Sequence, residues 1–152
     1  MRTWTPDPDV RGRGWLLTVL LACALTASAH AASVEVRLIR ASDELDKTDE
    51  PLVKLEPKLK KVFGYQHYKQ LGFQKAPLKD KTPLRLDLGE GIVVFVTPTA
   101  VENKAHVMDF EMFSGRAALV KSTIRASRNR ELLIRGPDVG STLLIVSLVV
   151  VE

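Results

Sequence analysis

The last twelve residues of the chain, 141–152, are apolar on both alternating parities. Because side chains alternate across a β-strand, both faces of this run must be covered by protein. The run is too short for a transmembrane helix, which needs about 20 residues, and its many valines favour a strand. We therefore predict a central buried strand here, and a second one at residues 92–96, which are also apolar on both faces.

Shorter alternating runs predict the remaining strands. Met108, Phe110 and Met112 alternate with Asp109 and Glu111, which is typical of a strand with one buried face. Similar runs predict strands at residues 34–40, 67–75, 84–88, 117–125 and 132–134. Eight strands in one domain of this length most simply form an antiparallel β-sandwich. A small closed β-barrel is the alternative.

Proline and glycine mark the predicted turns between these strands. Pro98 and a turn at 102–104 should end the 92–96 run, and Ser114 with Gly115 should form a two-residue hairpin turn. Residues 136–140, Gly-Pro-Asp-Val-Gly, are expected to form a rigid loop before the last strand.

One short helix is predicted between the first and second strands, over residues 55–63. Apolar residues recur there at three- or four-residue spacing: Leu52, Leu55, Leu59 and Val62. Pro57 suits the first turn of a helix, where its missing N–H costs nothing. Gly64 suits the C-terminal stop.

The first 31 residues resemble a secretory signal peptide. Arg11 and Arg13 supply a basic region, residues 15–25 an apolar region, and Ala29-His30-Ala31 a small-residue cleavage site. Cleavage there leaves a single predicted domain, residues 32–152, with 19 basic and 16 acidic side chains and a net charge of +3. This weak positive charge does not argue for nucleic-acid binding. We expect an exported protein, periplasmic or secreted.

Cys23 opens an alternative for the same segment. Residues 20–23, Leu-Leu-Ala-Cys, resemble a bacterial lipobox, in which the cysteine becomes lipidated and anchors the domain to a membrane. Intact mass after export distinguishes the two forms. Cys23 is the only cysteine, so the mature domain has no disulfide and depends on its hydrophobic core. No second apolar stretch predicts a transmembrane span.

Catalytic and cofactor motifs are not evident in the predicted mature chain. Its two histidines, His67 and His106, lack zinc-site spacing, and Ser114 lies in a turn and not in a nucleophile elbow. His106 lies on the apolar parity of its strand, which predicts a partly buried, hydrogen-bonded side chain. The acidic loop 41–51 lacks calcium-loop spacing. We expect no enzyme activity, cofactor or metal; a hydrolase built from scattered loop residues is a lesser alternative.

Residues 54–81 combine eight lysines with interleaved aromatic rings. Lysines supply a positive field and aromatic rings can stack on ligands, so this segment is a candidate surface for an anionic polymer. Its proposed binding residues are Lys58, Lys60, Lys61, Tyr65, His67 and Tyr68. The alternative is that the aromatic rings belong to the core and the lysines only solvate the outside.

Two stretches resemble a family of uncharacterised exported bacterial β-domain proteins. The first is residues 55–68, where a short helix is followed by Phe63, Tyr65 and Tyr68. The second is residues 132–145, which is similar to a family ending with two glycines before a proline, although Arg135 replaces the first glycine. The resemblance implies a similar layout for the mature chain, and no established activity or catalytic residues.

We therefore predict a non-enzymatic, exported β-sandwich that acts as a structural or protein-interaction module of the bacterial envelope. Its expected partner is another envelope protein. Residues 34–40 are the predicted docking edge, because an exposed strand can pair with an extended partner segment. The alternative partner is an anionic polymer bound by residues 54–81.

Overall fold

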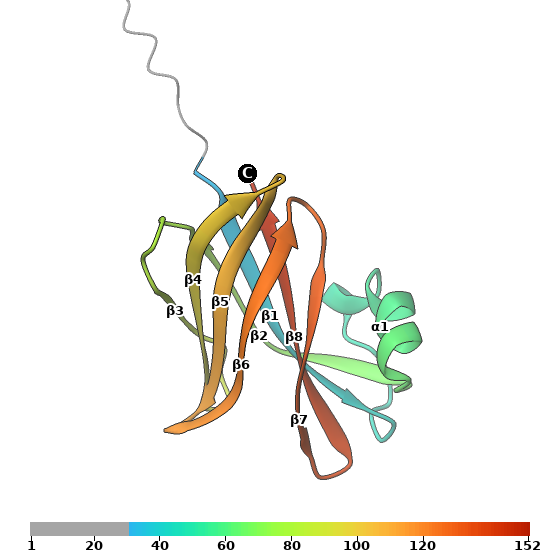
Figure 1. Cartoon of the computed structure of the whole chain (residues 1–152). Coiled ribbons are helices and arrows are strands. Elements are labelled where there is room, and N and C mark those ends of the chain that lie inside the picture. Colours follow the sequence, from blue (N-terminus) through green and yellow to red (C-terminus); the bar gives the residue numbers. More distant parts are fainter. Residues whose placement is uncertain (1–30) are drawn as a thin grey trace, which may run out of the picture.

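Eight antiparallel strands form two four-stranded sheets in the computed structural model, which describes residues 31–152 (Figure 1). Sheet A has the order β2 (His67–Pro77), β1 (Ser33–Ser42), β8 (Thr142–Val151), β7 (Leu132–Val139). Sheet B has the order β3 (Leu84–Asp87), β4 (Ile92–Glu102), β5 (Ala105–Ser114), β6 (Ala117–Ser127). The predicted sandwich is confirmed, and within 31–152 the strands do not close into a barrel.

Residues 1–30 of the predicted signal peptide (1–31), including Cys23, lie outside the described part of the chain. Across residues 31–152, no helix has the length and apolar character needed to cross a bilayer.

β8 is the central strand that its sequence predicts. It pairs with β1 on one side and β7 on the other. Leu144, Val146 and Leu148 face sheet B, whereas Leu143 and Ile145 are buried on the opposite face of sheet A. β4 is also an internal strand, between β3 and β5, as its two apolar faces predict.

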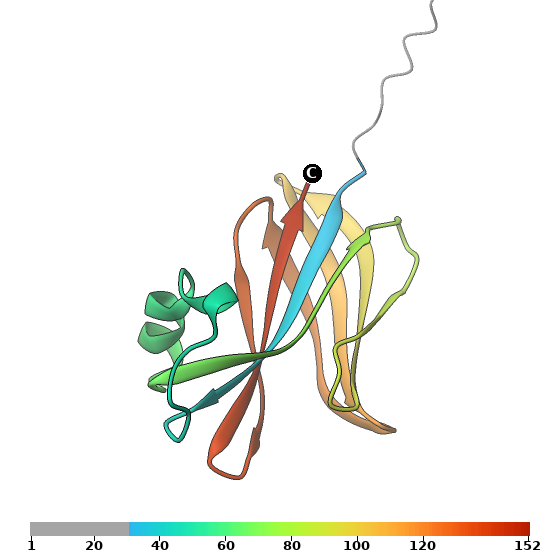
Figure 2. The same cartoon turned by 180° about the vertical axis from the view of Figure 1, so that it is seen from behind.

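Two hydrophobic cores explain why β8 is apolar on both faces. The main core lies between the sheets and includes Val36, Leu38, Phe110 and Met112. The second core lies on the outer face of sheet A, beneath the short helices η1 (Glu50–Leu52) and α1 (Glu56–Phe63). Figure 2 shows α1 and sheet B on opposite sides of sheet A. Sheet A is therefore the middle layer at this end of the molecule.

The helix α1 follows its predicted signals, with one difference. Pro57 lies in its first turn, and Gly64 ends it with a φ of 82°, a left-handed conformation that glycine adopts without strain. Leu59 is fully buried against sheet A, but Val62 is 57% exposed. A helix of only eight residues packs against the sheet through a narrow apolar face, so not every apolar residue of its pattern reaches the core.

The β2–β3 side of the sandwich is closed by a close backbone contact. A Cβ atom at Gly72 would lie 1.8 Å from the carbonyl oxygen of Leu88, so only glycine fits there. Beside it, the Gln74 side-chain amide donates a hydrogen bond of 2.7 Å to the Asp87 carbonyl. Strands β2 and β3 therefore meet without room for a further segment at this crossing.

The prediction that residues 34–40 form a sheet edge is wrong. β1 is an internal strand, paired with β2 and with β8 along its length. Glu35 and Arg37 project onto the outer face of sheet A and Arg40 faces sheet B, so the charged side chains leave the backbone free to pair on both sides.

Two predicted breaks are strand residues instead. β4 continues through Pro98 to Glu102, with a bulge between Pro98 and Ala100. The Pro98 carbonyl accepts a hydrogen bond from the Lys81 amide at 3.0 Å, on the side away from β5. The missing N–H of Pro98 faces the same side and removes no β4–β5 bond. Similarly, β7 extends through the predicted loop to Val139 by means of a bulge between Arg135 and Asp138. The hairpin turn after β5 lies at 115–116, one residue later than predicted.

Candidate functional site

The three predicted binding lysines lie on α1, but two of them are already engaged. The Lys58 ammonium donates to the backbone carbonyl of Glu131 at 2.7 Å. Lys60 pairs with Glu56 at 2.9 Å, and this pair holds the pKa of the Glu56 carboxyl below its ordinary value. Lys61 is exposed to solvent. Lys58 therefore connects α1 to residue 131, Lys60 pairs within the helix, and Lys61 has no such contact within residues 31–152.

The predicted aromatic partners lie mainly beneath the helix. Tyr68 is fully buried in the second core, and Tyr65 is partly buried against it. His67 is partly buried, with a buried Nδ1 that has no hydrogen-bond partner in the described part of the chain. Since the Tyr68 ring cannot reach a ligand in the folded domain, the six predicted residues do not form one exposed basic and aromatic face.

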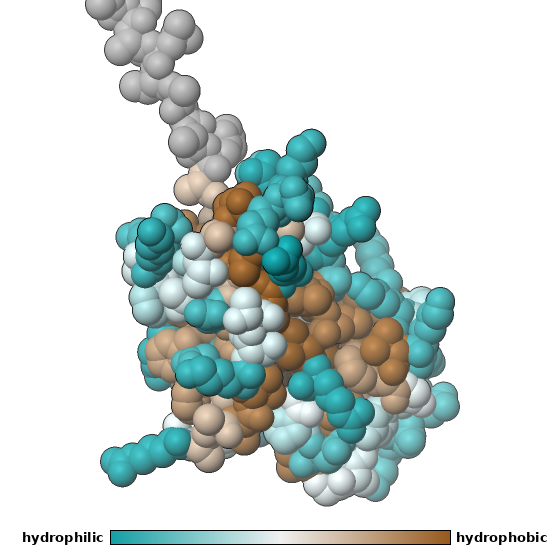
Figure 3. All heavy atoms as spheres, in the orientation of Figure 1, coloured by the Kyte–Doolittle hydropathy of each residue, from teal (hydrophilic) through white to brown (hydrophobic). Residues whose placement is uncertain are grey.

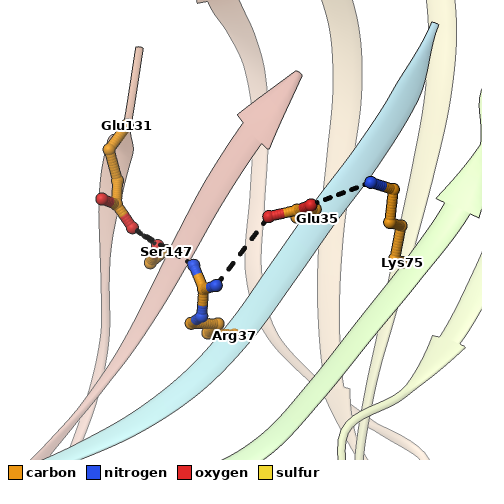
Figure 4. A network of polar contacts seen from close by, with 5 residues as sticks. All are labelled: Glu35, Arg37, Lys75, Glu131 and Ser147. Atoms are coloured by element: carbon orange, nitrogen blue, oxygen red, sulfur yellow. Dashed lines mark hydrogen bonds and ion pairs between the residues drawn. The ribbon is translucent and has the colours of Figure 1, made fainter. Parts of the chain in front are cut away.

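A polar network covers the outer face of sheet A beside the second core (Figure 4). The Arg37 guanidinium lies 3.8 Å from both Glu35 and Glu131, and 4.7 Å from the centre of the Phe73 ring. Lys75 pairs with Glu35 at 3.0 Å. Glu131 also accepts a hydrogen bond from the buried Ser147 hydroxyl.

This network is best explained as a structural connection. Its two carboxylates, Glu35 and Glu131, each have at least one basic partner and together link β1, β2 and β8 to the start of β7. A cleft of about 250 Å³ lies between the network and η1, lined by Arg37, Pro51, Leu52, Lys54, Leu55 and Glu131.

Three of the four sheet edges are obstructed. At the start of β2, the amides of Tyr68 and Gln70 donate to the side chains of Thr48 (3.2 Å) and Asp49 (2.9 Å), so a loop covers the first part of this edge. β3 has only four residues and is crossed by β2. β7 is interrupted by its bulge and contains Pro137, which has no N–H.

β6 is the edge that stays open. It is 11 residues long, and from 117 to 126 no other described segment makes a hydrogen bond to its outer side. Ser122 pairs with the buried Phe110 of β5 and so lies on the face toward sheet A, yet its side chain is exposed. The two sheets therefore do not meet fully along β6, in contrast to the closed β2–β3 side.

An apolar seam lies between β6 and β7. Val120 of β6 and Leu132 and Ile134 of β7 pack against the main core but are only partly buried. Figure 3 shows apolar surface gathered in a band down the middle of this face, where β6 and β7 lie in Figure 1. Unpaired backbone beside partly exposed apolar side chains is the combination that strand addition requires.

The residues around this seam are strongly basic. Residues 116–135 contain a single acid, Glu131, and six basic side chains: Arg116, Lys121, Arg125, Arg128, Arg130 and Arg135. Four of the six pair with acids elsewhere, as in Lys121–Glu111 and Arg125–Glu102. Sequence reasoning missed this stretch because it concentrated on lysines near aromatic residues. A count of charge along the chain would have found it.

The seam leads to a cleft of about 360 Å³ where the two sheets separate. Leu71, Ile92, Leu119 and Leu144 supply apolar walls, and Arg40 of β1 pairs across the sheets with Glu90 at 3.5 Å. The other lining residues are Ser114, Pro137, Asp138 and Val139. These residues combine an apolar interior with charged side chains, which suits binding of a side chain or small ligand.

The residues considered for catalysis and metal binding lie apart. His106 is buried, as predicted, but its Nε2 has no hydrogen-bond partner among residues 31–152, and neither His67 nor His106 lines the cleft that contains Ser114. Within residues 31–152, no group of three or more histidine, cysteine or acidic side chains is arranged to hold a metal ion.

No protein-family model, curated protein or solved structure matches the chain. The resemblance to exported bacterial proteins of uncharacterised function therefore stays a prediction. The function must be inferred from the surfaces described above.

Proposed function

We propose that this protein is an exported, non-enzymatic interaction module of the bacterial envelope that binds an extended acidic segment of another envelope protein along β6. The observation that carries the proposal is the open edge of β6 beside a partly exposed apolar seam. An added strand would gain backbone hydrogen bonds from β6 and would bury alternate side chains in the seam.

Charge favours an acidic partner over a second copy of this chain. Two β6 strands paired with each other would bring together two segments in which basic side chains outnumber acidic ones six to one, and like charges on neighbouring strands are destabilising. An acidic segment would meet the same side chains with opposite charge. Arg130, which pairs with no acid in residues 31–152, adds to this attraction.

The predicted signal-peptide cleavage site is compatible with the position of the first strand. Cleavage after Ala31 would leave β1 intact, because that strand begins at Ser33. The domain would then retain both cores. Lipidation at Cys23 is the alternative, and it would tether the same domain through a linker of small residues.

A defined peptide tests strand addition along β6. We expect the domain to bind a synthetic peptide of about ten residues that alternates valine with glutamate, a length matched to an ordinary strand. The same peptide with lysine in place of glutamate should bind much more weakly. Hydrogen exchange should slow at β6 amides, while the amides of Tyr68 and Gln70 in β2, already bonded to the loop, should not change.

Two variants on one strand locate the binding. Ser122→Lys places a charge on the seam side of β6 and should abolish peptide binding, because an inward-facing charge blocks strand pairing. Thr123→Lys adds the same charge on the opposite face, near Asp109, and should retain binding. Equal loss in both variants, or protection of β2 in place of β6, would contradict the proposal.

A further inference from the structure

The outer face of sheet B carries a shallow apolar hollow that strand addition does not use. It has a volume of about 340 Å³ and is lined by Arg85, Val93, Phe95, Phe113, Gly115 and Arg116. Val93 and Phe113 are cross-strand neighbours, and Phe95 meets Phe113 edge to face with 5.8 Å between ring centres. All three apolar side chains are only partly buried, although they lie on a solvent-facing side of the sheet.

Two arginines lie at the hollow without an acidic partner. Neither Arg85 nor Arg116 forms an ion pair with a carboxylate of residues 31–152. Arg85 is directly opposite Phe95 in the β3–β4 pairing, and Arg116 lies in the turn that follows β5. Both guanidinium groups are therefore available to an anion beside the rings.

Two carboxylates lie near the hollow, and both have partners other than these arginines within residues 31–152. Asp87, opposite Val93, accepts a hydrogen bond of 3.1 Å from the Gly89 amide in the turn after β3. Glu111, opposite Phe95, pairs with Lys121 and raises the pKa of that lysine. Neither acid neutralises Arg85 or Arg116 directly.

We infer that this hollow binds an acidic polysaccharide, with the apolar face of a sugar ring against Phe95 and Phe113 and its carboxylates on Arg85 and Arg116. A planar guanidinium binds a carboxylate through two parallel hydrogen bonds, which favours such a ligand over a diffuse anion. The aromatic rings add contact with the carbon-bound hydrogens of a sugar, which a simple polyanion lacks. This inference is independent of strand addition along β6.

Titration calorimetry with three matched ligands tests the inference. We expect an oligogalacturonate to bind the intact domain. Its methyl ester retains the sugar rings but loses the charge, and its affinity should be at least about tenfold lower. Inorganic polyphosphate should also bind more weakly, since it has charge without an apolar ring face. Equal affinities for polyphosphate and oligogalacturonate would show that the surface binds anions through charge alone, and would overturn the inference.

Matched variants place the site on the molecule. The double variant Arg85→Gln and Arg116→Gln should weaken oligogalacturonate binding by at least about tenfold. The double variant Lys58→Gln and Lys61→Gln removes the same charge from α1 and should leave this affinity unchanged. Full affinity in the arginine variant, or an equal loss in the lysine variant, would refute the assignment. Circular dichroism should confirm that both variants keep the β-sheet signal.

Discussion

Tyr68 shows how one residue can satisfy the pattern of a binding site and still belong to the core. In the sequence it lies beside lysines and another tyrosine, as a ligand-stacking ring would. In the fold it is fully buried among Ile39, Leu59 and Leu143, because β2 turns it toward α1. Its hydroxyl group is also buried, and no group of residues 31–152 forms a hydrogen bond with it, which is costly for a polar group.

Burial raises the pKa of Tyr68 to about 12, although the nearby backbone amide of Tyr65 offsets part of the rise. The ordinary value is 10.0, so the unfolded chain loses this proton first as the pH increases. The contribution of Tyr68 to the free energy of unfolding is therefore fully present below pH 10. It decreases by about 3 kcal/mol in total as the pH rises through 12.

Tyr68→Phe isolates this contribution. At neutral pH we expect the variant to be more stable than the wild type by about 1 kcal/mol, because the unpaired hydroxyl is removed and the ring is kept. Above pH 10 the advantage should grow, because phenylalanine does not ionise. Urea denaturation of both proteins at neutral and alkaline pH measures the difference, and other titrating groups cancel between them. A constant difference at all pH values would show that Tyr68 is not buried as described.

At the scale of elements, the sequence predicts strands and the helix well, but not which strand lies beside which. The double-faced apolar pattern of residues 141–152 requires a central strand, and β8 is one. β1, in contrast, has the alternation of a half-exposed strand. Alternation predicts which face of a strand is buried, but it does not predict whether the strand lies at the edge or in the middle of a sheet. Its position between β2 and β8 follows from long-range pairing, which no local pattern encodes.

The candidate site was harder to predict for the same reason. The seam depends on Ser122 being exposed between two sheets, and the hollow depends on Val93, Phe95 and Phe113 meeting across two strands. Neither juxtaposition is visible before the strand order and register are known. The basic character of residues 116–135 was visible in the sequence, but its role beside an open edge was not.

The helix α1 offers a test of the second core at the level of one element. Leu59→Ala should destabilise the domain by about 2–4 kcal/mol, because Leu59 is fully buried between the helix and sheet A. Val62→Ala, on the same helix but 57% exposed, should change stability by less than about 0.5 kcal/mol. Urea denaturation gives both values. Similar effects at the two positions would mean that α1 is not docked as described.

At the scale of the whole molecule, β8 joins the two cores. Its residues facing sheet B contribute to the main core, and Leu143 and Ile145 contribute to the second core beneath α1. Within the described chain, β8 is also the only strand that pairs with both β1 and β7. Loss of this one strand therefore removes packing from both sides of sheet A at once.

A chain that ends after Gly140 should accordingly fail to fold cooperatively and should aggregate. Without β8, β1 and β7 would expose unpaired backbone beside apolar side chains, which promotes association between chains. A chain that ends after Val150 keeps nearly all of β8 and should unfold in one cooperative transition. Thermal circular dichroism and sedimentation of the two proteins measure these outcomes. A soluble, cooperatively folding chain without β8 would instead require β1 and β7 to pair directly, so that the last strand would be an addition to sheet A and not its centre.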